Sequence, residues 1–199
     1  LRIYGLNNID IPTRVTSSVS NSTENLQFAL RNKISDYLTD NGFNEMLNNS
    51  ITKSAYYTEV ELTQAVKLLN PLSSDLDIMR LNMMYNGLEV LQYNRNRRAT
   101  DMHVYEFGKT YTKQNQTYAE QTHLTLFTIG KKHTETWQGA APSTTYYTLK
   151  SILQNILKKA GVKKMDITTT TGSLINQTMI SSQQKTLVTF GGVDAKTRK

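Results

Sequence analysis

Two segments of the chain repeat apolar residues at the spacing of an amphipathic helix. Residues three or four apart share one face of a helix, so each segment is expected to pack one face against another layer. The first segment spans residues 24–41 and its stripe is Leu26, Leu30, Ile34 and Leu38. The second spans residues 145–160 and its stripe is Tyr146, Leu149, Leu153, Ile156 and Leu157. Asn21 and Glu24 have the spacing of a capping box, and Gly42 and Gly161 suit helix ends.

Shorter apolar segments between and after these helices predict strands. Strands are expected at residues 65–69, 102–107 and 123–129, with a polar loop over residues 109–121, a further helix over 79–93, and strands and turns after 168. Helices scattered irregularly among neighbouring strands favour an α+β layer with a mainly antiparallel sheet. The two amphipathic helices are expected to cover one side of that sheet.

Residues 1–23 contain Pro12 and a polar stretch, SSVSNST, with little periodicity. They are predicted to be a connector, and residues 24–199 one folded domain. No apolar run approaches the roughly 20 residues that span a bilayer, and the first ten residues do not resemble a signal peptide. The chain has no cysteine, so it forms no disulfide or thiolate metal site. A cytoplasmic protein with no membrane partner is expected.

The net charge of +7 is unevenly distributed along the chain. The first 99 residues hold 10 basic and 10 acidic residues, whereas the last 100 hold 13 and 6. Lysine pairs at 131–132, 158–159 and 163–164 account for much of the excess. Either a solvated face or a nucleic-acid contact explains such a distribution.

Residues for catalysis or metal binding do not stand out. The three histidines, at 103, 123 and 133, have neither the spacing of a metal motif nor an acidic cluster beside them. Gly191-Gly192 lacks the lysine of a phosphate-binding loop, and no serine lies in a nucleophile elbow. The sequence therefore predicts no catalytic residue and no metal ligand.

Several motifs, in one order, resemble the beta chain of bacterial-type phenylalanyl-tRNA synthetases. RIYGLNNI at residues 2–9 resembles the family's RIYGYNNIP, with Leu6 in place of an aromatic residue. NGFNE at 41–45, NPLSSDLDIMR at 70–80, YNRNRR at 93–98 and YEFGKTY at 105–111 also have counterparts in the family. Trp137 and the segment at 144–157 resemble the family's tryptophan and the helix DFFDLKGxLExLL, although threonines replace its two acidic residues.

This resemblance implies a class II aminoacyl-tRNA synthetase-like core that carries no activation chemistry, because the alpha subunit performs it. The implied partners are that alpha subunit, a second beta chain in an (αβ)2 tetramer and phenylalanine tRNA. ATP and magnesium are cofactors of the parent enzyme and none is expected in this fragment. The chain is expected to be truncated at its C-terminus, before the glycine-rich third motif. The alternatives are a free-standing regulatory module of the same degenerate fold and a single-strand nucleic-acid binder.

The motifs also imply where function resides. Class II adenylation uses an arginine in the pattern apolar-Arg-x-Glu, but HVYE at residues 103–106 has Val104 there, and Tyr105 and Phe107 are expected to help fill the vestigial pocket. The family places a subunit interface at the first motif, which implies interface roles for Gly42, Phe43 and Glu45. A further contact, with nucleic acid or an acidic partner, is predicted for Arg95, Arg97 and Arg98, for which a solvated loop is the alternative.

Overall fold

The computed structural model describes residues 2–10, 13–14, 16–18, 26–71, 73, 75–115, 117–133, 135–137 and 139–193. Much of the expected connector, with Pro12, Asn21 and Glu24, lies outside these residues, so its boundary and its capping box stay predictions. A 3-10 turn, η1 (Leu6–Asn8), lies in the described part of that segment. Within the described ranges, none of the helices combines the length and apolar character that a membrane crossing requires.

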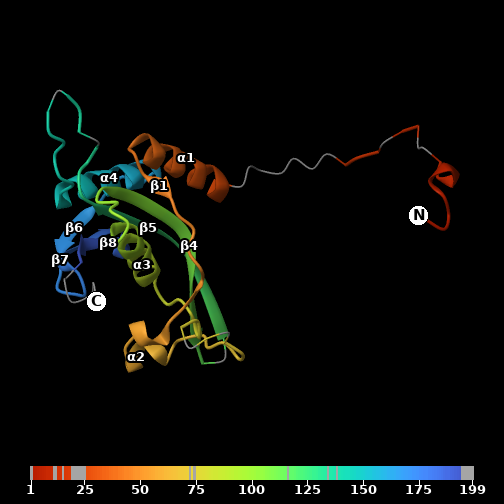
Figure 1. The fold of residues 1–199 in the computed structure, drawn as a ribbon, viewed down its shortest axis with the longest axis horizontal. Helices are drawn as coiled ribbons and strands as arrows, with labels where there is room; N and C mark the ends of the chain where they lie inside the picture. The colour runs from red at the N-terminus through yellow and green to blue at the C-terminus, as the bar shows by residue number, and fades with distance from the viewer. Residues whose placement is uncertain are drawn as a thin grey trace.

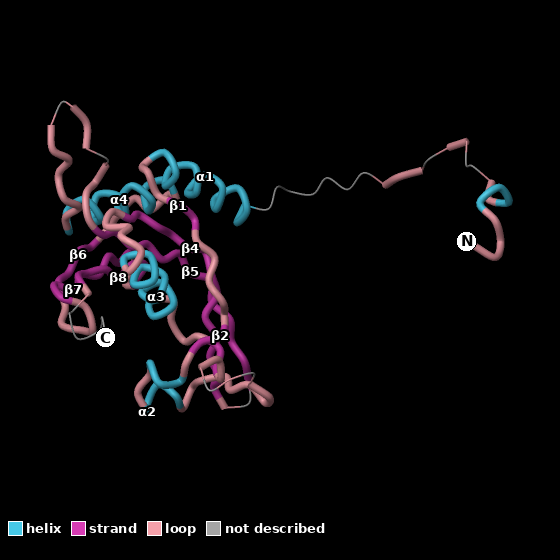
Figure 2. The backbone as a smooth tube through the Cα atoms, in the orientation of Figure 1, coloured by secondary structure: helices cyan, strands magenta, loops and turns pink. Residues whose placement is uncertain are grey.

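A long antiparallel hairpin forms the centre of the fold (Figure 2). Strand β4 (Met102–Gln114) pairs with β5 (Thr117–Ile129) in one register from Met102↔Ile129 to Gln114↔Thr117. The short strand β1 (Asn44–Glu45) adds parallel to β4. The loop expected over residues 109–121 is therefore wrong. Cross-strand pairs such as Lys109 with Glu120, joined at 2.6 Å, continue the ladder to a turn at Asn115.

Two helices cover one face of this hairpin, as the sequence predicts (Figure 1). Helix α1 (Leu26–Asp40) and helix α4 (Tyr146–Lys159) share a core with the sheet. The buried members of that core are Ile34, Leu38, Phe43, Tyr105, Ile152 and Ile156. The first half of α1 extends the apolar stripe without burying it, since Leu26, Phe28 and Leu30 are exposed.

A second antiparallel sheet contains β6 (Asp166–Thr169), β7 (Ile175–Ser182) and β8 (Lys185–Gly192). It packs on the other side of the α4 stripe, where Leu153 and Leu157 contact Ile180 and Phe190. Helix α4 is thus shared by both sheets, which explains why its apolar stripe is wide. The strands expected after residue 168 are confirmed.

Helix α3 (Met84–Arg95) lies on the face of the hairpin opposite α1 and α4 (Figure 1). Gly87 lets α3 lie close to the sheet, because a Cβ at this position would lie 2.2 Å from the ring of Phe127 on β5. The helix expected over residues 79–93 begins too early, since Met79 belongs to strand β3 (Ile78–Met79), which pairs with β2 (Ile51–Thr52).

The strand expected at residues 65–69 is also wrong, because that segment forms only an isolated bridge, Lys67↔Ile78. It follows a short helix, α2 (Glu59–Leu62), and a 3-10 turn, η2 (Ser54–Tyr56). A backbone hydrogen bond of 2.9 Å from Lys113 to the carbonyl of Gln64 joins this small unit to the far end of the hairpin.

Candidate functional site

A buried ion pair lies on the sheet face that α3 covers. Arg80, which follows β3, places its Nη1 2.9 Å from Oε1 of Glu106 on β4. The side chains are only 2% and 1% exposed. Glu106 reaches this face because side chains alternate along a strand, which sends Val104 and Glu106 to one side and Tyr105 and Phe107 to the other.

Further hydrogen bonds satisfy both charged groups. Arg80 Nε donates to the carbonyl of Lys109 at 2.8 Å, and the backbone and side-chain amides of Asn48 donate to the two Glu106 oxygens at 3.3 and 2.7 Å. Gly108 leaves room for the guanidinium, since a Cβ there would lie 2.2 Å from Arg80 Nη2. A buried ion pair persists only when its remaining donors and lone pairs are matched in this way. The pair therefore fastens β4 to the segments at residues 48–49 and 80.

A histidine extends this polar group along the sheet. His123 on β5 lies with its Nε2 2.9 Å from Thr110 Oγ1 on β4. Burial lowers the pKa of His123, and the nearby positive charge of Arg80 lowers it further. The lowered pKa favours the uncharged ring at neutral pH. The hydrogen bond between His123 and Thr110 links β5 to β4, so the role of this histidine is structural.

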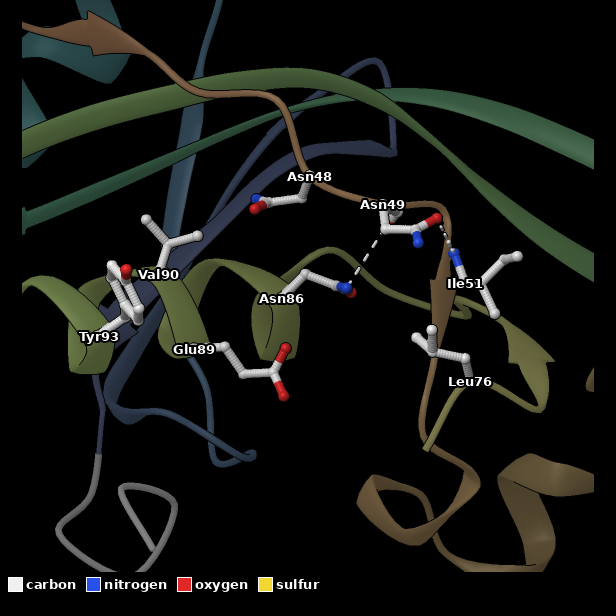
Figure 3. Close-up of a pocket in the computed structure, with 8 residues that line it drawn as sticks. All are labelled: Asn48, Asn49, Ile51, Leu76, Asn86, Glu89, Val90 and Tyr93. Carbon is white, nitrogen blue, oxygen red and sulfur yellow. Dashed lines mark hydrogen bonds between the residues drawn. The ribbon is translucent and has the colours of Figure 1, made fainter. Parts of the chain in front are cut away.

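An open pocket of about 320 Å³ lies between α3 and the segment at residues 48–51 (Figure 3). Its lining is Asn48, Asn49, Ile51, Leu76, Asn86, Glu89, Val90 and Tyr93. The Asn86 amide donates to the carbonyl of Asn49 at 3.3 Å, which ties the helix to the opposite wall. Among the residues described in the structure, no group of three or more histidine, aspartate or glutamate side chains could hold a metal ion.

The carboxylate of the pocket already has partners. The Tyr56 hydroxyl donates to Glu89, and Lys53 Nζ lies 3.8 Å from the same carboxylate. Burial and then the Glu89 carboxylate raise the pKa of Tyr56 to about 12. The phenol is therefore a hydrogen-bond donor at neutral pH and does not supply a base.

The comparisons with known proteins identify the family of this fold. The family model described as "Phenylalanyl tRNA synthetase beta chain CLM domain" matches residues 11–194. The chain belongs to this family. A phenylalanine–tRNA ligase beta subunit of Bacteroides thetaiotaomicron is 41% identical over 175 residues, which cover 81% of this chain and 21% of that protein. One of Bacteroides fragilis is 36% identical, over 100% of this chain and 26% of that protein. The chain thus spans about a fifth to a quarter of these relatives.

Solved structures agree with the synthetase beta-chain assignment at the level of the fold. Two structures of pyrrolysyl-tRNA synthetase from Desulfitobacterium hafniense superpose with TM-scores of 0.65 and 0.63, at 17% and 16% identity. The match to the first structure covers 82% of this chain and 55% of the chain in that structure. The architecture is therefore that of a class II-like tRNA synthetase, with mixed helices and antiparallel sheets. The alternative of a free-standing regulatory module is not favoured, because the relatives named above are beta subunits.

The structure places Val104 of this synthetase-family strand on the same face as Glu106. Val104 pairs with Phe127 on one side and Asn44 on the other. The expectation that Tyr105 and Phe107 fill a vestigial pocket on that face is wrong. Both rings lie on the α1 and α4 side, where Tyr105 is 2% exposed.

The three residues predicted for a subunit interface lie in different environments. Gly42 is exposed, with a φ of +81° that ends α1. Phe43 is only 3% exposed and contacts the ring of His103, so its side chain belongs to the core of this chain. Glu45 is exposed and pairs with Arg31 at 3.1 Å. The interface role of Gly42 and Glu45 stays a prediction, and Phe43 does not present a free side chain to a partner.

The three predicted basic residues lie together at the end of α3, and all are exposed. Arg95 ends the helix, the Arg97 guanidinium stacks 3.3 Å above the ring centre of Tyr93, and Arg98 takes a φ of 68°. Their role stays a prediction. The sequence reasoning missed the pairing of Arg80 with Glu106, although each residue ends one of the family motifs.

Proposed function

We propose that this chain is a non-catalytic assembly module of a phenylalanyl-tRNA synthetase beta chain, supporting attachment of phenylalanine to tRNA by the alpha subunit. The proposal rests on the side chains that occupy the sheet face opposite α1 and α4. Val104 stands where the adenylation motif has arginine, and the carboxylate of Glu106 is bound by Arg80 and Asn48. Stabilising the charge that develops at the α-phosphate of ATP during adenylyl transfer requires a fixed cationic donor, and Arg80 is already paired within the protein.

ATP and magnesium then act in the parent enzyme and not on this chain. A diffuse charge of +7 steers anions toward a surface but orients none of them for attack. The proposed partners are the alpha subunit and a second beta chain in an (αβ)2 tetramer that presents phenylalanine tRNA, in the cytoplasm.

The exposed half of α1 supports the assembly role. Leu26 is 81% exposed and Phe28 63%, although both belong to a helix whose later turns bury Ile34 and Leu38. Burial of apolar surface contributes about 25 cal/mol per Å², so covering these side chains with a partner subunit would stabilise the assembly. This part of α1 is the proposed contact with the alpha subunit.

Two experiments test the proposal separately. Calorimetry with ATP and magnesium on this chain should show no saturable binding, and binding that depends on the Met102–Phe107 part of β4 would disprove the loss of chemistry. For assembly, the variant Phe28→Asp should co-purify poorly with the alpha subunit while unfolding at the parent temperature.

The matched control is Phe43→Asp, which changes the same residue type in the core. It should lower the unfolding temperature of the isolated chain, since a buried charge without a partner is costly. If Phe28→Asp co-purifies with the alpha subunit at the parent yield, the exposed half of α1 is not the contact surface.

A further inference from the structure

A second pocket lies on the other face of the sheet from the Arg80–Glu106 pair. It has a volume of about 170 Å³ and is enclosed by the end of α1, the first turns of α4 and the adjoining ends of β4 and β5. The ten lining residues are Tyr37, Asn41, Phe43, His103, Thr128, Lys132, Thr148, Ser151, Ile152 and Asn155. Several lining residues belong to the family motifs at residues 41–45 and 144–157, but neither those motifs nor the proposed assembly role gives this pocket a ligand.

The lining has the chemistry of an anion site. Eight of the ten residues carry polar side chains and none of the ten is acidic. Lys132 supplies a positive charge at the wall, and Lys159 lies close by, with its Nζ 4.9 Å from the ring centre of Tyr37. Without an opposing carboxylate in the lining, these charges give the pocket a positive potential.

The walls are fixed independently of any ligand. Asn155 Nδ2 donates to the Tyr37 hydroxyl at 3.1 Å, and Asn41 Nδ2 donates to the Tyr37 carbonyl at 2.7 Å. His103 Nε2 lies 2.9 Å from the carbonyl of Lys131, and its ring contacts that of Phe43. The site is therefore preformed, which reduces the entropy cost of binding.

The groups that would meet a ligand remain unpaired. In the ranges that the structure describes, no salt bridge or hydrogen bond engages the Lys132 ammonium, whereas neighbouring Lys131 pairs with Glu135. The hydroxyls of Thr128 and Ser151 likewise have no hydrogen-bond partner within those ranges. The backbone amide of Lys132 donates to the carbonyl of Pro142 at 2.8 Å, which anchors the residue at the pocket wall.

We propose that this pocket binds a phosphate-type oxyanion, with Lys132 as the charged donor and the hydroxyls of Thr128 and Ser151 as neutral donors. Charge-assisted hydrogen bonds from an ammonium and adjacent hydroxyls are the interactions that such an anion needs. The α4 dipole adds to them, because Thr148 at the pocket wall lies in the first turn of that helix. The oxyanion is either a free phosphate or a phosphate of a nucleic acid.

The test is titration of the 199-residue chain with inorganic phosphate, followed by ³¹P NMR or calorimetry, with chloride added to hold ionic strength constant. Binding should be saturable, and Lys132→Gln should weaken it about tenfold or more, the scale of one lost hydrogen bond to a charged group. The control is Lys163→Gln, which removes the same charge from an exposed residue outside the lining, and it should change the affinity less than twofold.

Ser151→Ala provides a second variant at an exposed position and should weaken binding without changing the unfolding temperature. Absence of saturable binding, or equal losses in Lys132→Gln and Lys163→Gln, would overturn the proposal in favour of diffuse attraction. Competition with a short single-stranded RNA distinguishes the two sources. Displacement of phosphate by RNA, lost in Lys132→Gln, identifies a nucleic-acid phosphate, whereas phosphate binding that RNA leaves unchanged identifies the free ion.

Discussion

Replacing Arg80 by methionine tests whether the buried ion pair holds this fold together. The change leaves the Glu106 carboxylate 1% exposed with only the two Asn48 amides as donors, and it leaves the Lys109 carbonyl without its donor. Removing one partner of a buried pair costs about 3–5 kcal/mol. Since a domain is stable by about 5–15 kcal/mol, Arg80→Met should remove a large part of the total.

A double variant separates the pair from its surroundings. With Arg80→Met and Glu106→Leu together no charge remains buried, and apolar residues in place of a buried ion pair are often tolerated without loss of stability. The residual cost is that of the two Asn48 amides and the Lys109 carbonyl, about 1–3 kcal/mol for each group that water does not reach, and Asn48 is only partly buried. The double variant should therefore be more stable than Arg80→Met alone. The two single losses should be strongly non-additive, as contacting residues are.

Urea unfolding followed by far-UV circular dichroism measures these differences, provided that the slope of free energy against urea stays constant. The control is Arg31→Met, which breaks the exposed pair with Glu45, whose side chains are 51% and 45% exposed, and should cost less than about 1 kcal/mol. An Arg80→Met loss no larger than that of the control, or additive losses in the double variant, would refute the reasoning.

Three further predictions follow from local geometry. Gly87→Ala should lower the unfolding free energy by about 1–3 kcal/mol in urea, because the new Cβ meets the ring of Phe127; an unchanged midpoint would contradict the close packing of α3. In ultraviolet pH titration, the difference between the parent and Tyr56→Phe should show a phenol with a pKa of about 12, which Glu89→Gln lowers. Because this pKa is raised above 10.0, the hydroxyl adds stability below pH 10 that disappears as the pH rises through about 12; a Tyr56 that titrates near 10 would count against the contact. Trp137 is 92% exposed, so acrylamide should quench the native fluorescence nearly as fully as that of the unfolded chain, and a protected signal would be the contrary result.

The elements that could be predicted from the sequence are those with a strong local pattern. Helix α4 could be predicted almost to its ends, because its apolar stripe and Gly161 agree, and the structure adds a capping box at Thr145. The central parts of β4 and β5 were predicted from their apolar residues. Their outer halves were not, because polar pairs such as Lys113 over the ring of Tyr118 stabilise a ladder only once the strands are aligned. Helix α3 starts late for a similar reason, since Met79 pairs across strands with Ile51.

The candidate site was predictable only in part. The valine at position 104, where the adenylation pattern has arginine, can be read directly from HVYE. The side of the sheet that Tyr105 faces is known only once the strand is placed in the fold. Phe43 was assigned to an interface because a family motif contains it, and burial in the core is visible only after α1, β4 and α4 come together. Arg80 and Glu106 are 26 positions apart, and no periodicity relates them.

Val104 and Glu106 lie on the same face of β4 but contribute differently to the packing of the fold. Both residues face α3, and the carboxylate between the guanidinium of Arg80 and the amides of Asn48 joins three separate segments of the chain. The Val104 side chain is only partly buried, so the residue at this position contributes little to the core. Losing Glu106 would leave the Arg80 charge buried without a counter-charge, which is far more costly. The contacts within the fold therefore account for the carboxylate at this position, and the presence of Glu106 in β4 is by itself no sign of adenylation chemistry.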